Sequence, residues 1–181
     1  MSPNEQRDGS NGGCPSPKIA VMALWQFKMT LVPTELVGDR SSLTEQEYNE
    51  EWMGLRQPPE DFKVRFAAIL PSRKSWADNL AQWGRQDGDL IEVWQSSDRV
   101  ESISARIDCR DLNAQFIRQI FDLAREWGFR LVYNRYRTVL PDDWEGFVRA
   151  VCDSPNLKFM QAPEVWLPKL AKEVSQSNKK S

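Results

Sequence analysis

The part of the sequence that most constrains the fold is segment 100–109, where apolar and polar side chains alternate. The apolar set is Ile103, Ala105, Ile107 and Cys109, and the polar set is Ser102, Ser104, Arg106 and Asp108. A period of two places successive side chains on opposite sides of a strand, so we expect one side in a core and the other in solvent. Residues 90–95 form a second β-rich run, and only the polar segment 96–99 lies between the two. Together they predict an antiparallel hairpin.

Other segments carry the signals of further strands and helices. We predict strands over residues 19–31, 62–70 and 129–133 from their apolar or alternating composition. Thr44 and Glu47 have the spacing of a capping box, which predicts a short helix ending at Gly54. Further helices are predicted over residues 76–83 behind Ser75, over residues 112–127 behind Asp111, from Pro141 as first helical residue, and from Pro163 onward.

The helix predicted over residues 112–127 has the clearest amphipathic pattern in the chain. Its apolar side chains recur with a period of 3.6 and form one stripe: Leu112, Phe116, Ile120, Leu123, Ala124 and Trp127. Such a stripe needs a partner surface, and the apolar side of the hairpin supplies one. We therefore predict an α+β fold, a two-layer sandwich in which a mostly antiparallel sheet has helices packed on one face.

Length and charge limit the domain organisation and the classes of partner. The chain has 181 residues, which suits one domain. We expect a disordered N-terminal tail over 1–17, a single globular domain over 18–174 and a polar C-terminal tail over 175–181. The net charge of −2 argues against nonspecific binding to nucleic acid. No apolar run has the roughly 20 residues of a membrane span, so we expect no membrane partner.

The cysteine and histidine content excludes several chemistries. The chain contains Cys14, Cys109 and Cys152, with no CxxC pair, and it has no histidine. Zinc sites draw mainly on cysteine and histidine, and this chain supplies too few of either, so we predict neither a metal site nor a cofactor. The lack of histidine also removes the commonest general base. An odd number of cysteines without paired spacing is typical of reduced thiols, which predicts a cytoplasmic protein.

The polar side of the predicted sheet is the candidate binding surface. It presents the side chains of Lys28, Glu92, Trp94, Ser104, Arg106 and Asp108. Trp94 is the reason to single it out, because a large aromatic residue among polar neighbours is typical of an interface anchor. The chain has eight tryptophans, and Trp52, Trp76, Trp83 and Trp94 have no packing role that periodicity explains. The alternative interpretation is a plain solvated sheet face.

These features favour a non-catalytic protein-binding module over an enzyme. No nucleotide-binding glycine loop, nucleophile elbow or zinc-protease motif is present in the sequence. Within the binding class, an acidic α+β domain suits an immunity- or inhibitor-type protein that covers a basic partner protein. Two alternatives stay open. One is a carboxylate-based enzyme centred on Asp108 with Arg106 and Arg110, and the other is a structural subunit of a larger assembly.

Overall fold

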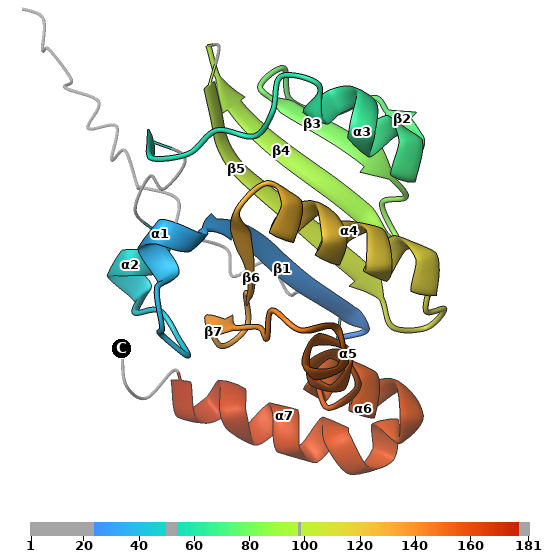
Figure 1. Ribbon diagram of the computed structural model, residues 1–181. Helices are drawn as coiled ribbons and strands as arrows, with labels where there is room; N and C mark the ends of the chain where they lie inside the picture. The colour runs from blue at the N-terminus through green and yellow to red at the C-terminus, as the bar shows by residue number, and fades with distance from the viewer. Residues whose placement is uncertain (1–23, 50–53, 98, 178–181) are drawn as a thin grey trace, which may run out of the picture.

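One antiparallel sheet organises the chain, shown in Figure 1 as a computed structural model that describes residues 24–49, 54–97 and 99–177. Within these ranges seven strands follow the order β2-β3-β4-β5-β1-β6-β7. The strands are β1 (Gln26–Pro33), β2 (Ser72–Arg73), β3 (Leu80–Gly84), β4 (Leu90–Ser96), β5 (Arg99–Asp108), β6 (Phe129–Tyr133) and β7 (Thr138–Val139). The helices are α1 (Thr34–Val37), α2 (Glu45–Asn49), α3 (Phe62–Ile69), α4 (Ala114–Glu126), α5 (Trp144–Cys152), α6 (Pro155–Gln161) and α7 (Pro163–Ser177). The α+β class and the antiparallel sheet are confirmed.

The main core lies on one side of the sheet, which we call the inner face. It contains the apolar side chains of the alternating strands, including Phe27, Met29, Ile103 and Ile107. Helices α3, α4, α5 and α6 all contribute buried residues to this core, and α3 and α4 lie in front of the sheet in Figure 1. The predicted stripe of α4 is buried from Phe116 to Trp127. Leu112 is the exception, because it precedes the helix and is 42% exposed.

A smaller cluster covers part of the opposite side, which we call the outer face. Val32 of β1 and Val132 of β6 pack there against Val37 and Leu43 from the region of α1 and α2. The capping box at the start of α2 is confirmed: the Thr44 amide donates to Glu47 Oε2 (2.8 Å), and the Glu47 amide donates to Thr44 Oγ1 (3.2 Å). The short helices α1 and α2 thus cover the outer face where β1, β6 and β7 lie, opposite the helices on the inner face.

A β-bulge lies near the end of the hairpin formed by β4 and β5. It allows an even-numbered residue of β5, Val100, to face the same core as the odd-numbered Ile103. Trp94 pairs with Ser102, but Gln95 pairs with Val100, so Glu101 is an extra residue on β5. The bulge turns Val100 toward the main core, in which Ile103 also lies. Trp94, before the irregularity, keeps its side chain on the outer face.

Both edges of the sheet are short. Strands β2 and β7 have two residues each. The outer side of β7 is also bonded to the segment before α2, because the Leu43 amide donates to the Arg137 carbonyl (2.9 Å) and the Val139 amide donates to the Ser41 carbonyl (2.9 Å). Little backbone is therefore left to pair at that edge.

Two predicted elements have the wrong type. The strand predicted over 62–70 is instead helix α3, which covers Phe62–Ile69. Phe62 and Phe66, one turn apart, are both buried, and Phe66 packs on Trp83 with ring centroids 5.2 Å apart. Residues 76–83 were expected to be helical, but β3 begins at Leu80 and pairs with β4. Ser75 caps only a turn, since its Oγ accepts from the Ala77 amide (3.3 Å).

Several boundaries also differ from prediction. The cap of α4 is Asn113 instead of Asp111, and the cap of α5 is Asp143, so Pro141 precedes that helix. Helix α6, capped by Ser154, was not predicted. Of the strand predicted over 19–31, residues 19–23 lie outside the described residues, and β1 begins at Gln26. Helix α7 continues to Ser177, into the segment 175–181 expected to be a polar tail, and the predicted N-terminal tail over 1–17 lies outside the described residues.

We expect Ile120→Ala to lower the free energy of unfolding by about 2–5 kcal/mol, because it deletes buried methyl groups beneath α4 and leaves a cavity. Ile120 is 1% exposed. Urea denaturation measures the change. Val64→Ala on α3, at a position 72% exposed, is the control and should stay within about 0.5 kcal/mol of the wild type. An unchanged midpoint for Ile120→Ala would contradict the packing of α4 on the sheet.

The two described cysteines should differ in reactivity. Cys109 and Cys152 are both free thiols; Cys109 is buried and Cys152 is exposed. Burial raises the pKa of the Cys109 thiol to about 12, so the reactive thiolate is scarce there at neutral pH. Iodoacetamide should therefore modify Cys152 in the native protein and Cys109 only after denaturation, as read by peptide mass spectrometry. Rapid labelling of native Cys109, or a Cys109–Cys152 disulfide, would contradict this expectation.

Candidate functional site

Strand pairing brings all the predicted site residues onto the outer face. Lys28 pairs with Arg106, Glu92 with Ser104, Trp94 with Ser102, and Asp108 with Gln26. Side chains of directly paired residues lie on the same face of a sheet. These residues are Lys28, Glu92, Trp94, Ser104, Arg106 and Asp108. Their surroundings nevertheless differ along the strands, and three regions can be separated.

The first region lies at the Asp108 end, where the loop of residues 85–89 is fastened to β5. Arg106 Nη2 donates to the Gln86 carbonyl (2.6 Å), and Arg110 Nη2 donates to the Asp87 carbonyl. Asp89 Oδ1 accepts from the Asp108 amide (2.9 Å). The guanidinium of Arg106 on β5 thus holds the loop that joins β3 to the neighbouring strand β4.

The sharp entry into this loop depends on Gly84. Its φ is +105°, a conformation that residues with a side chain rarely adopt, and a Cβ atom there would lie 2.3 Å from the Asp89 carbonyl oxygen. The Arg85 amide donates to that same carbonyl (2.8 Å) and closes the loop. The loop position is therefore fixed by backbone geometry as well as by the two arginines.

The carboxylate of Asp108 is held tightly by Arg110. Arg110 Nε lies 2.9 Å from Oδ1 and Nη2 lies 2.7 Å from Oδ2, and the Arg110 amide also donates to Oδ1 (3.0 Å). Burial opposes ionisation of Asp108, but these hydrogen bonds and the charge of Arg110 outweigh it and lower the pKa. In contrast, burial raises the pKa of the neighbouring Asp89. A carboxylate with a lowered pKa is a weak general base.

The second region is a polar network at the centre of the face. Both oxygens of Glu92 are occupied: Gln82 Nε2 donates to Oε1 (2.9 Å) and Lys28 Nζ lies 3.3 Å from Oε2. Gln82 and Ser104 are buried, at 2% and 8% exposure. The charges of Lys28 and Glu92 balance each other, so these two side chains support the face more than they offer open contacts.

The third region is the aromatic end, formed by Trp94 and Trp76. Trp76 comes from the segment between β2 and β3 and is 73% exposed. It meets the partly exposed Trp94 edge to face, with ring centroids 5.6 Å apart and an interplanar angle of 70°. The segment is fixed by the Asn79 carbonyl, which accepts from the Gln95 amide (2.8 Å). We refer to these two rings as the Trp76–Trp94 pair.

Sequence reasoning placed Trp94 correctly on the outer face but did not identify Trp76 as its neighbour. The sequence feature that could have identified Trp76 was the set of four tryptophans without a packing role explained by periodicity. In the structure, the members of this set have different surroundings. Trp83 is in the main core at 4% exposure, and Trp52 lies outside the described residues. Trp76 was assigned to a helix, so its contact with Trp94 across β3 and β4 was not foreseen.

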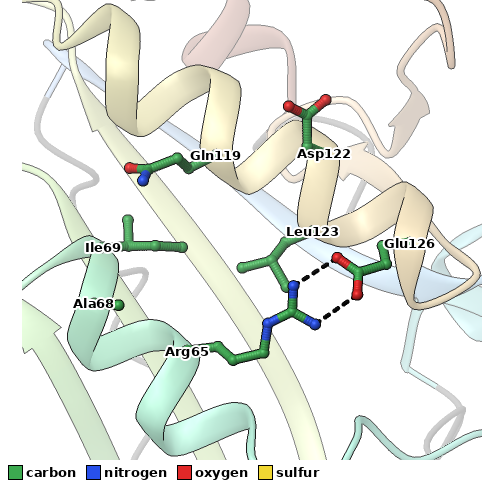
Figure 2. A pocket seen from close by; sticks show the side chains of 7 residues that line it. All are labelled: Arg65, Ala68, Ile69, Gln119, Asp122, Leu123 and Glu126. Carbon is green, nitrogen blue, oxygen red and sulfur yellow. Dashed lines mark hydrogen bonds and ion pairs between the residues drawn. The ribbon is translucent and has the colours of Figure 1, made fainter.

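A groove lies on the inner side of the sheet, between α3 and α4 (Figure 2). It has a volume of about 290 Å³ and an apolar floor that includes Ala68, Ile69 and Leu123. Arg65 and Glu126 face each other at one end and form two hydrogen bonds of 2.6 Å. Because these charges neutralise each other, the groove offers no unbalanced charge at that end for a ligand.

Comparisons with known proteins add no relative: no family model, no curated protein and no solved structure matches the chain. None of the helices in the described ranges combines the length and apolar character needed to cross a bilayer. The same ranges contain no group of three or more Cys, Asp or Glu side chains arranged to hold a metal ion. The function must therefore be argued from the outer face itself.

The two neighbouring carboxylates should affect stability with opposite pH trends. A carboxyl group whose pKa is lowered by folding stabilises the fold above its ordinary pKa, and this contribution is lost as the pH falls through the folded value. Asp108→Asn should therefore cost about 1–3 kcal/mol at neutral pH, because it breaks charged hydrogen bonds, and the deficit should shrink on acidification.

Asp89→Asn is the matched variant for this test. The pKa of Asp89 is raised, so its charged form opposes folding at neutral pH and its protonation relieves that cost. The stability of Asp89→Asn relative to the wild type should therefore fall as the pH is lowered, while that of Asp108→Asn rises. Urea midpoints measured from neutral to acidic pH test the contrast, and parallel trends would contradict it.

Proposed function

We propose that this chain is a non-catalytic module that binds a partner protein through the Trp76–Trp94 pair. The observation that carries the proposal is the exposure of Trp76, 73%, in direct ring contact with Trp94. A tryptophan held in place at the surface keeps a large apolar area in water, and covering that area favours association. Rigid aromatic anchors of this type supply much of the binding energy at protein interfaces.

The carboxylate-enzyme alternative is less well supported. It requires Asp108 as a base and both Arg106 and Arg110 as anion-binding groups. Asp108 has a lowered pKa, and both of its oxygens accept from Arg110. Arg106 donates to the carbonyl of Gln86. These side chains are engaged in holding the loop of residues 85–89, which accounts for their conjunction without catalysis.

The structural-subunit alternative would be favoured by one large apolar patch. The exposed large apolar side chains of the described residues instead come from several elements and loops, with Val165 and Leu167 both on α7: Leu55, Val64, Trp76, Leu112, Tyr136, Val165 and Leu167. Among these, Trp76 is the one in ring contact with another partly exposed tryptophan. The distribution supports a compact anchor rather than an extended assembly surface.

The narrower proposal is a cytoplasmic immunity- or inhibitor-type protein. It rests on the acidic net charge of −2, which would speed encounter with a basic partner. Its mark would be an association rate that falls as salt is added, since screening weakens long-range attraction. An association rate independent of salt would leave the binding module in place and remove this narrower assignment.

The decisive experiment begins with a pull-down from the native host and identification of captured proteins by mass spectrometry. Calorimetry with the purified partner should then show that Trp76→Ala weakens binding by about 2 kcal/mol or more, roughly 30-fold. Trp94→Ala should act similarly. Val64→Ala, at an equally exposed position on α3, is the control and should bind like the wild type. Wild-type affinity in Trp76→Ala would contradict the proposed face.

A further inference from the structure

We infer that the partner presents an arginine side chain to the Trp76–Trp94 pair, with its guanidinium over the ring of Trp76 and paired with the carboxylate of Asp78. This inference rests on the proposed function and specifies the chemistry that the same face recognises.

Most of the described tryptophans carry a cation from the chain itself. Arg118 lies over Trp144 at 4.8 Å from the ring centroid, Arg110 over Trp25 at 5.0 Å, and Arg65 over Trp127 at 5.5 Å. Lys169 lies over Trp166 at 4.5 Å. The electron-rich face of an indole attracts such cations, and arginine also stacks through its planar group.

The Trp76–Trp94 pair departs from this pattern. Trp83 needs no cation because it is packed in the core, where Phe66 contacts it. Trp76 and Trp94 contact each other, and no lysine or arginine of residues 24–49, 54–97 and 99–177 lies over either ring. Since Trp76 is 73% exposed, a face of its ring is accessible to a cation from outside the chain.

The charges beside Trp76 decide between a cationic and an anionic occupant. Asp78 and Lys74, each two residues from Trp76, are both exposed, and neither forms an ion pair with another described residue. A guanidinium would be attracted by the indole face and by Asp78 and repelled by Lys74, whereas an acidic group would be attracted by Lys74 and repelled by both the indole face and Asp78, so the balance favours the guanidinium. The acidic net charge of the chain adds to this preference.

The test uses nuclear magnetic resonance on the full ¹⁵N-labelled chain, with the indole N–H signals assigned through Trp76→Phe and Trp94→Phe. The probes are the peptides acetyl-Gly-Arg-Gly-Arg-Gly-amide, its citrulline counterpart, which is neutral and nearly the same shape, and its glutamate counterpart. The arginine peptide should shift the signals of Trp76 and Trp94 saturably. The citrulline peptide should bind about three- to tenfold more weakly, because it lacks the charge that the ring attracts.

Two charge variants sharpen the comparison. Asp78→Asn should weaken the arginine peptide about two- to fivefold, the loss of one exposed ion pair. Lys74→Gln should leave its affinity unchanged or raise it, and Val64→Ala should have no effect. Equal shifts with arginine and citrulline, no shift of the Trp76 signal, or stronger binding of the glutamate peptide would each overturn the inference.

The natural partner separates failure of this inference from failure of the proposed function. If Trp76→Ala abolishes partner binding but the arginine peptide shows no preference over citrulline, the binding module stands and the arginine inference is wrong. If the arginine peptide is preferred but Trp76→Ala leaves partner affinity unchanged, the proposed face is wrong, and the inferred partner contact is overturned with it.

Discussion

The apolar sides of β1 and β5 must be covered, and the rest of the molecule follows from how this is done. Helix α4 supplies the cover through Phe116 and Ile120, which are each 1% exposed. A slip of one residue in the pairing of β1 with β5 would turn Arg106 toward this core, so burial fixes the register. The same register determines which polar side chains share the outer face. The composition of the candidate site is thus a consequence of core packing.

The side chains of the outer face have different partners at different positions along the strands. At one end, arginine and aspartate side chains hold the loop of residues 85–89, and in the middle Glu92 balances Lys28. The charged side chains in these two regions of the outer face are therefore held by partners within the fold. At the other end an aromatic pair remains with neighbouring charges that lack described ion-pair partners. Because most charges of this face are paired within the fold, the proposed binding function assigns recognition to the small region around Trp76 and Trp94.

Local signals in the sequence predicted the elements that depend on local pattern. The alternation in β5, the stripe of α4 and the capping box at Thr44 are of this kind, and the elements form as expected. The exceptions are Leu112, which is exposed, and Ser104 and Asp108, which were expected in solvent but are buried. Prediction failed where partners distant in sequence decide the structure. Segment Phe62–Ile69 is short and has a composition typical of a strand. Its helical conformation is explained by the contacts of Phe66 with Trp83 and Trp127, which are distant in sequence. Likewise, the contact of Trp76 with Trp94 depends on the pairing of β3 with β4.

The short edges of the sheet have a consequence for how this protein can meet copies of itself. Polymerisation by strand pairing needs a long row of unpaired backbone amides and carbonyls at a sheet edge. At the β7 edge, the backbone of residues 137–139 is already hydrogen-bonded to residues 41–43. The opposite border, β2, is two residues long. Fibril-like growth by strand addition is thereby discouraged at both borders. Association of two copies through the exposed indole of Trp76 would instead rely on side-chain contacts, which do not extend the sheet.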